Sequence, residues 1–292
     1  RFVVPFAPGG TSEIVARSVA AELTKQLGQS VYVENKPGGA GVTAMADVAK
    51  AAPDGHTIIL SHVGTMAVNP YMLKSQPYDV NKDFLPVTLL AKVPNVFVIH
   101  PDVPAKNFKE FVEYAKANPG KLNYASSGNG SIQHIAGELF KQLTGTFITH
   151  IPYRGSGPAV QDLLAGQVDL HLTTPASMVS HIKAGKLKGL AVTSTDRLKA
   201  LPQLPTATEA GLKGLTLDSW FALYAPAGTP PDIVQQLNTE VARILTNPDV
   251  KKKAEDSGTS VEIMTPTQLG EYTKKELDAW GRVIKSAQIT VD

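Results

Sequence analysis

Residues 2–27 read FVVPFAPGGTSEIVARSVAAELTKQL. The opening apolar residues predict a buried strand, and Pro8-Gly9-Gly10 interrupts it. From Ser12 onwards one stripe recurs at helical spacing: Ile14, Val15, Ser18, Val19 and Leu23. This strand, glycine loop and helix predict an α/β fold in which a ligand binds where strands end and helices begin.

The same alternation continues along the chain. Further strands are expected at 31–34, 57–60, 122–125, 147–151, 168–172, 188–193 and 215–224. Helices are expected at 42–51, 106–117, 131–143, 157–165 and 176–184, and over most of 231–289 with a strand at 260–263. Such alternation predicts mostly parallel sheets covered by helices on both faces.

The length of 292 residues favours two lobes over one core. Extended apolar runs at 95–100 and 218–224 bracket a region with its own α/β rhythm. We therefore expect lobe 1 at 1–98 plus 224–292 and an inserted lobe 2 at 99–223, joined by a double hinge.

The composition excludes several classes of protein. A net charge of +2 is too weak for a nucleic-acid footprint, and the absence of cysteine excludes disulfides and thiolate chemistry. No apolar run approaches the length of a membrane span. Arg1 stands directly before a strand, so we expect that a signal peptide was removed and that the protein works outside the cytoplasm.

Three glycine-bearing loops each join a strand to a helix, at 8–12, 126–131 and 154–158. A helix N-terminus has unpaired N–H groups and the positive end of the helix dipole, so it suits an anion. Glycine lets the backbone approach a ligand closely. Each loop alone is equally consistent with an ordinary capped turn, but the loops at 8–12 and 126–131 come from different expected lobes.

A dinucleotide site is one alternative, because Gly39-Ala40-Gly41-Val42-Thr43-Ala44 fits G-x-G-x-x-A. Residues 35–38 loosen that turn, however, and Asp54 lies in a Pro-Asp-Gly turn instead of at a strand end. No phosphate-loop motif is present either. We interpret 39–44 as a structural turn and expect no cofactor.

A hydrolase or transferase is a second alternative. Ser131 and His134 are three residues apart on an expected helix, with Asp162 or Asp169 as a possible orienting acid. There is no G-x-S-x-G elbow and no histidine pattern typical of a metal site, so no catalytic or metal-binding residue is expected. Asp169, among apolar neighbours, is expected to be a structural hydrogen-bonding acid.

Many segments resemble the Bug receptors, the solute-binding proteins of tripartite tricarboxylate transporters. The similarity covers nearly the whole chain in order. It runs through residues 6–10, Ala16-Arg17, 33–38, 53–57, 124–128, His134, 152–155, Pro158-Ala159, 166–169, Pro205-Thr206, 209–211 and 225–230.

This resemblance implies a type II periplasmic-binding-protein clamshell that captures a small carboxylated solute and delivers it to membrane transporter subunits. It implies a periplasmic monomer that is not an enzyme; a receptor that signals to a partner would need the same clamshell and stays an alternative. The ligand-binding positions that it implies are Phe6, Pro8, Gly9, Gly10, Thr11, Ser12, Glu13, Ser61, His62, Ser127, Gly128, Asn129, Gly130, Ser131, His134, Thr174 and Pro175.

Glu13 departs from the family, which usually has Asp at this position. A carboxylate in the first helical turn competes with a ligand anion for the same N–H groups. Glu13 therefore either caps its own helix or meets a cationic group of the ligand, and we predict the local cap.

Overall fold

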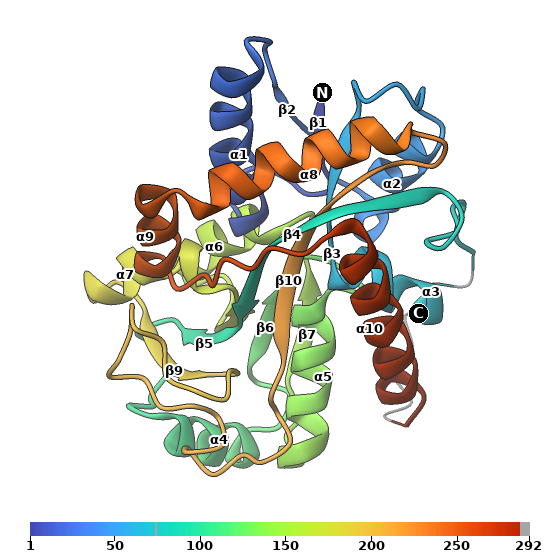
Figure 1. The fold of residues 1–292 in the computed structure, drawn as a ribbon. Coiled ribbons are helices and arrows are strands. Elements are labelled where there is room, and N and C mark those ends of the chain that lie inside the picture. The colour runs from blue at the N-terminus through green and yellow to red at the C-terminus, as the bar shows by residue number, and fades with distance from the viewer. Residues whose placement is uncertain (74, 287–292) are drawn as a thin grey trace.

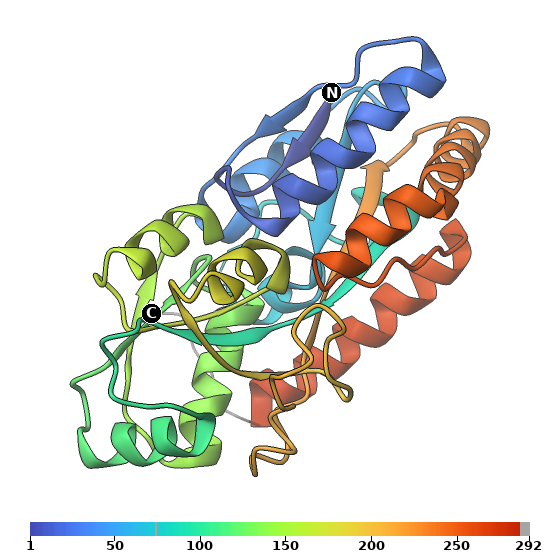
Figure 2. The same cartoon turned by 90° about the vertical axis from the view of Figure 1, so that its left-hand side faces the viewer.

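Two five-stranded sheets organise the computed structural model, which describes residues 1–73 and 75–286. The strand order is β2-β1-β3-β10-β4 in the first sheet and β7-β6-β8-β5-β9 in the second. Figures 1 and 2 show that each sheet forms its own α/β lobe. The strands are β1 Phe2–Val4, β2 Val33–Asn35, β3 Ile58–His62, β4 Phe84–Pro94, β5 Val96–Ile99, β6 Asn123–Ser126, β7 Thr149–Pro152, β8 Leu170–Thr173, β9 Lys188–Val192 and β10 Asp218–Pro226.

Helices cover both faces of each sheet. The first lobe contains α1 Thr11–Leu27, the short turn Gly39–Gly41, α2 Val42–Ala49, the π-helical turn Gly64–Val68, α3 Asn69–Met72, α8 Pro231–Thr246, α9 Pro248–Asp256 and α10 Pro266–Ser286. The second lobe contains α4 Phe108–Ala117, α5 Ile132–Thr144, α6 Ser156–Leu164, the turn Pro175–Ser177 and α7 Val179–Lys183. The part of the last expected helix beyond 286 lies outside the described residues.

The continuous apolar run in β1 follows from burial on both faces. Phe2 and Val4 belong to one apolar cluster with residues of α1 and α8, while Val3 belongs to the other, with residues of α2 and α10. A strand that is buried on both faces has apolar residues at every position instead of alternating polar and apolar ones. The continuous apolar run Phe2-Val3-Val4 therefore predicts this strand correctly.

Both sheets are mixed rather than mostly parallel. In the first sheet β1 pairs in parallel with β2 and β3, whereas β10 is antiparallel to both of its neighbours. In the second sheet the β6 pairings are parallel and those of β5 are antiparallel. The antiparallel pairs are made by β5 and β10, the strands that follow or precede a crossing between lobes. Each runs in the direction opposite to its neighbours in the sheet.

The chain leaves the first lobe at Asn95, between β4 and β5, and β10 returns it. Thr193 connects both crossings: its N–H donates to the Asn95 carbonyl at 2.8 Å, and its carbonyl accepts from the Leu217 N–H at 3.1 Å. The Asn95 N–H also donates to Thr193 Oγ1 at 2.8 Å. The expected lobe boundaries at 98/99 and 223/224 fall inside β5 and β10.

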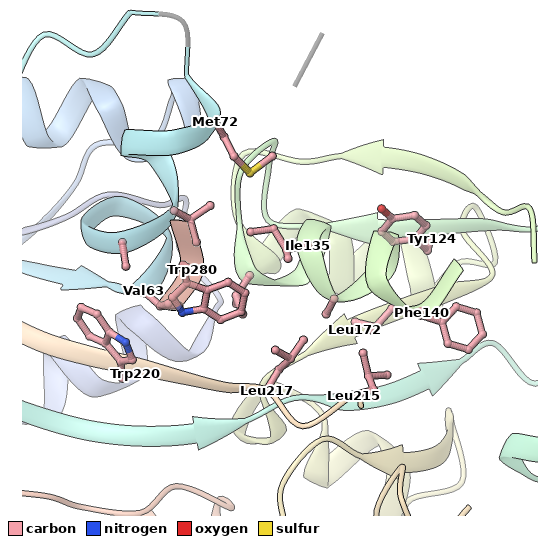
Figure 3. Close-up of a cluster of buried hydrophobic side chains, with 14 of the residues drawn as sticks. Val63, Met72, Tyr124, Ile135, Phe140, Leu172, Leu215, Leu217, Trp220 and Trp280 are labelled. Atoms are coloured by element: carbon pink, nitrogen blue, oxygen red, sulfur yellow. The ribbon is translucent and has the colours of Figure 1, made fainter. Parts of the chain in front are cut away.

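An apolar cluster continues from one lobe to the other behind this crossing. Figure 3 shows Trp220 and Trp280 at its first-lobe end, Phe140 and Leu172 at its second-lobe end, and Leu217 between them. The two lobes are therefore packed together on this side in addition to being joined by backbone.

Two strand assignments differ from the sequence analysis. The expected strand at 260–263 is wrong: within it only Ser260 makes a bridge, to Lys92. Strand β4 has no counterpart among the expected strands, and its Pro86 is tolerated because β4 lies at the edge of the sheet. Within residues 1–73 and 75–286, no helix is long and apolar enough to cross a membrane.

Candidate ligand-binding cleft

The loop after β1 forms the first-lobe side of the cleft. Gly10 is the N-cap position of α1 but supplies no side chain to cap it. Glu13 instead ties the preceding loop to the helix: its Oε2 accepts the Gly9 N–H at 2.6 Å, and its Oε1 pairs with Arg17 at 2.7 Å. Glu13 is thus hydrogen-bonded within its own loop and helix. In the described part of the chain, the Thr11 N–H has no acceptor.

The loop after β6 forms the second-lobe side. Gly128 and Gly130 have φ values of 133° and 76°, in the region that favours glycine. Ser131 caps α5, since its side chain accepts the His134 N–H at 3.2 Å. Ser127 donates to Gln133 at 2.8 Å. This loop is therefore held by its own helix, while its Asn129 N–H has no acceptor among the described residues.

The two lobes touch directly across the cleft. The Ala7 N–H donates to the Arg154 carbonyl at 2.9 Å, and Thr174 Oγ1 donates to Thr11 Oγ1 at 2.6 Å. A Cβ added to Gly157 would lie 1.9 Å from the Pro8 carbonyl oxygen. The next residue after Thr174, Pro175, lies against Gly258 of the first lobe. These contacts describe a closed clamshell.

Ser61 and His62 end β3, beside the loop that carries Phe6. Ser61 is fully buried and donates to Met45 Sδ at 3.3 Å, so its hydroxyl is directed to the first-lobe core. The His62 ring lies 4.6 Å from that of Phe6, and its Nδ1 accepts the Thr65 N–H at 3.0 Å. Burial lowers the pKa of His62 to about 4.

His62 is therefore neutral at neutral pH, and its proton is on Nε2. That Nε2 is buried without a hydrogen-bond partner in the described part of the protein. An unpaired buried donor is costly, so this N–H is a polar group for which the described residues provide no acceptor.

The turn at Gly39–Gly41 also lies on the cleft, which the sequence analysis did not predict. Ala40 has a φ of 55°, and Asn69 holds the turn by donating to the Ala40 carbonyl at 3.0 Å. A Cβ on Gly128 would lie 4.0 Å from the Ala40 Cα. A cavity of about 490 Å³ is lined by residues of this turn, by Ser127, Gly128 and Asn129, and by Pro152, Tyr153 and Arg154.

The geometry does not assemble a Ser131–His134 catalytic pair. Ser131 Oγ accepts the backbone N–H of His134, while the imidazole Nδ1 accepts the Gly130 N–H at 3.2 Å. Asp162 accepts from the Tyr153 hydroxyl. Asp169 accepts the Asn123 N–H at 2.8 Å, as expected of a structural acid. No group of three His, Asp or Glu residues within 1–73 and 75–286 could hold a metal ion.

Comparison with known proteins identifies the family. The sequence model of the family described as the tripartite tricarboxylate transporter family receptor matches residues 15–289 of this chain. The chain belongs to this receptor family. It is therefore a periplasmic solute-binding receptor and not an enzyme, as the sequence predicted.

Three solved receptors illustrate the similarity. The periplasmic binding protein BugD is 36% identical, with a TM-score of 0.95 over 99% of this chain and 97% of that chain. Rpa4515 of R. palustris, solved with adipate, is 37% identical, with a TM-score of 0.96 over 99% of this chain and 97% of that chain. MatC from Rhodopseudomonas palustris, with bound malate, is 37% identical, with a TM-score of 0.92 over 97% and 98%. The clamshell fold predicted from sequence is thereby confirmed.

Proposed function

We propose that this receptor binds a small linear dicarboxylate between its lobes and delivers it to the membrane subunits of a tripartite tricarboxylate transporter. Two receptors that are each 37% identical hold adipate and malate, both dicarboxylates. The family itself is defined by its transporter. We further propose that it acts as a monomer, since one chain supplies both sides of the cleft.

The observation that carries the proposal is that each lobe contributes a loop at the start of a helix with an unpaired backbone N–H. The start of α1 offers the Thr11 N–H, and the loop before α5 offers that of Asn129. Such N–H groups, together with the helix dipoles, favour a carboxylate without requiring an arginine clamp. A dicarboxylate has an anionic group for each lobe and so stabilises the closed form over the open one.

The neutral polar groups around the loops support the same ligand class. The His62 Nε2–H, which we expect to donate to the ligand, is buried and unpaired within the described residues. Glu13, in contrast, is fully engaged by Gly9 and Arg17, so a cationic ligand group has no free carboxylate there. We propose that Thr11, Ser12, Ser127 and Thr174 complete the site.

We propose that the lobes rotate about the two crossings at Asn95 and Leu217, which Thr193 joins. On this basis residues 1–94 with 218–286 move as one body, and residues 96–216 as the other. These limits differ by a few residues from those expected from the sequence. The expected limits cut through β5 and β10, but each of these strands pairs along its full length within one sheet and so belongs to one lobe.

Isothermal titration with a series of C3 to C8 dicarboxylates tests the proposal. Adipate and malate are expected to bind, and hexanoate, which matches adipate but has one carboxylate, is expected to bind far more weakly. Adipate at 100 times its dissociation constant should raise the free energy of unfolding by about 2.7 kcal/mol. Equal binding of hexanoate, or preference for aspartate over succinate, would overturn the dicarboxylate assignment.

A further inference from the structure

Two histidines are linked by hydrogen bonds to the loop at 126–131, on the second-lobe side of the cleft. His134 Nδ1 accepts the Gly130 N–H at 3.2 Å. The Ser126 hydroxyl lies 2.6 Å from His150 Nε2 and accepts the Gly128 N–H at 3.1 Å. Both glycines of the loop are therefore connected to an imidazole, one directly and one through a serine.

The two imidazoles belong to a single stack. The rings of His134 and His150 lie 4.1 Å apart and nearly parallel, and the Tyr124 ring stacks on His150 at 4.8 Å. The Tyr124 hydroxyl donates to Glu138 at 2.8 Å, and Lys141 pairs with the same carboxylate at 2.8 Å. The stack thus joins β6, β7 and α5, which gives the histidines one fixed orientation.

The arrangement requires a neutral His134. Its Nδ1 can accept the Gly130 N–H only while that nitrogen carries no proton. Burial lowers the pKa of His134, although Glu138 opposes the shift and Lys141 adds to it. Burial, then the neighbouring His134 and Lys141, lower the pKa of His150 to about 3. Protonation of His134 would place an N–H against the Gly130 N–H and release the loop.

We infer that His134 and His150 are positioning residues, which fix Gly128 and Gly130 so that the N–H of Asn129 between them faces the ligand. The inference rests on the proposed function of this loop. It changes the expected role of His134, whose ring binds the loop backbone and is not required to touch the ligand. It also assigns a role to His150, which no sequence motif suggested.

Three variants separate positioning from simple structural support. H134Q supplies an acceptor that does not titrate, H134L removes the acceptor at similar size, and H56Q replaces a histidine whose side chain is 90% exposed. With adipate at pH 8, H134L is expected to bind roughly tenfold more weakly, the effect of one unpaired buried donor. H134Q is expected to recover most of that loss. Thermal unfolding establishes that each variant is folded.

The pH profile provides the decisive readout. Adipate affinity is measured from pH 8 down to pH 4 for the wild type, H56Q and H134Q in the same buffers, so that the range extends well below the ordinary histidine pKa and the titration of adipate itself is common to all. The wild type and H56Q are expected to lose affinity more steeply than H134Q as His134 gains a proton. Identical profiles for the wild type and H134Q would overturn the inference, as would full affinity in H134L.

A measurement without ligand keeps this inference separate from the proposed function. The Gly130 amide resonance of the wild type is expected to shift with pH as His134 titrates and to stay constant in H134Q. A constant resonance in both proteins would refute the positioning role even if adipate binds. A titrating resonance in a receptor that binds no dicarboxylate would instead refute the proposed function alone.

Discussion

Adding one methyl group at Gly157 is expected to prevent full closure without disturbing either lobe. Gly157 lies in the first turn of α6 and is not among the glycines with positive φ, so alanine suits its backbone. Alanine is favoured over glycine inside a helix by about 1 kcal/mol. Its Cβ, however, would lie 1.9 Å from the Pro8 carbonyl oxygen and 3.2 Å from the Gly9 Cα.

The size of the effect follows from that geometry. Real Cβ contacts are essentially never shorter than 3.0 Å, so the two backbones must separate by roughly 1 Å. Overpacking of this kind costs about 1–3 kcal/mol. Because Pro8 and Gly157 are on different lobes, the cost falls on the closed state only. If the ligand stabilises only that state, its dissociation constant should rise by a factor of roughly 5 to 150.

Calorimetry with adipate measures this change, and Gly270→Ala provides the matched control. Gly270 is also helical, but a Cβ there meets only Pro86 Cγ at 3.6 Å, an ordinary contact. The Gly157 variant should retain or raise its unfolding temperature without ligand, and its radius of gyration with saturating adipate should exceed that of the wild type. Wild-type affinity and a wild-type radius would refute the reasoning, because the lobes would then close without the Pro8–Gly157 contact.

Three further predictions follow from single contacts. His62 has a pKa near 6.5 in the unfolded chain but about 4 in the folded protein, so the unfolded chain binds its proton first as pH drops. The free energy of unfolding should therefore fall by roughly 3 kcal/mol between about pH 6.5 and pH 4. In urea titrations, the free energy of unfolding of His62→Gln should depend less steeply on pH than that of the wild type. Glu13→Gln should lower the free energy of unfolding by about 0.3–1 kcal/mol, because it weakens the Gly9 and Arg17 contacts, and should leave the order of affinities among diacids unchanged in calorimetry; a switch in ligand preference would contradict it. Thr174→Val should raise the adipate dissociation constant by roughly two- to tenfold, because it removes the hydrogen bond to Thr11 across the cleft, and an unchanged constant would show that this bond does not support closure.

The sequence predicted the elements whose physical causes are local. The apolar run of β1 and the amphipathic stripe of α1 required no knowledge of the partner elements. The strands beside the two crossings between lobes could also be predicted, because residues 95–100 and 218–224 form long apolar runs. Their antiparallel pairing was not visible, since direction depends on which sheet a strand joins and not on its own residues.

The candidate site divides in the same way. Glycines before expected helices predicted the loops at 8–12 and 126–131, and in the second loop Ser131 provides the expected cap, since capping is encoded within four residues. The role of Asn69 could not be predicted, since its hydrogen bond to the Ala40 carbonyl joins residues 29 apart. His150 was missed for a similar reason: its stack with His134 depends on the packing of β7 against α5.

The glycines of these loops have a second use that the sequence analysis did not separate from the first. A glycine that lets a ligand approach and a glycine that lets another backbone approach leave the same signature in a sequence. Gly155 and Gly157 are of the second kind, because added Cβ atoms would meet the Ala7 nitrogen at 3.0 Å and the Pro8 oxygen at 1.9 Å. The loop at 154–158 is therefore a surface on which the lobes meet, and substitutions there should change closure. Gly130 shares this property, because an added Cβ would lie 2.9 Å from Asn69 Oδ1 of the first lobe.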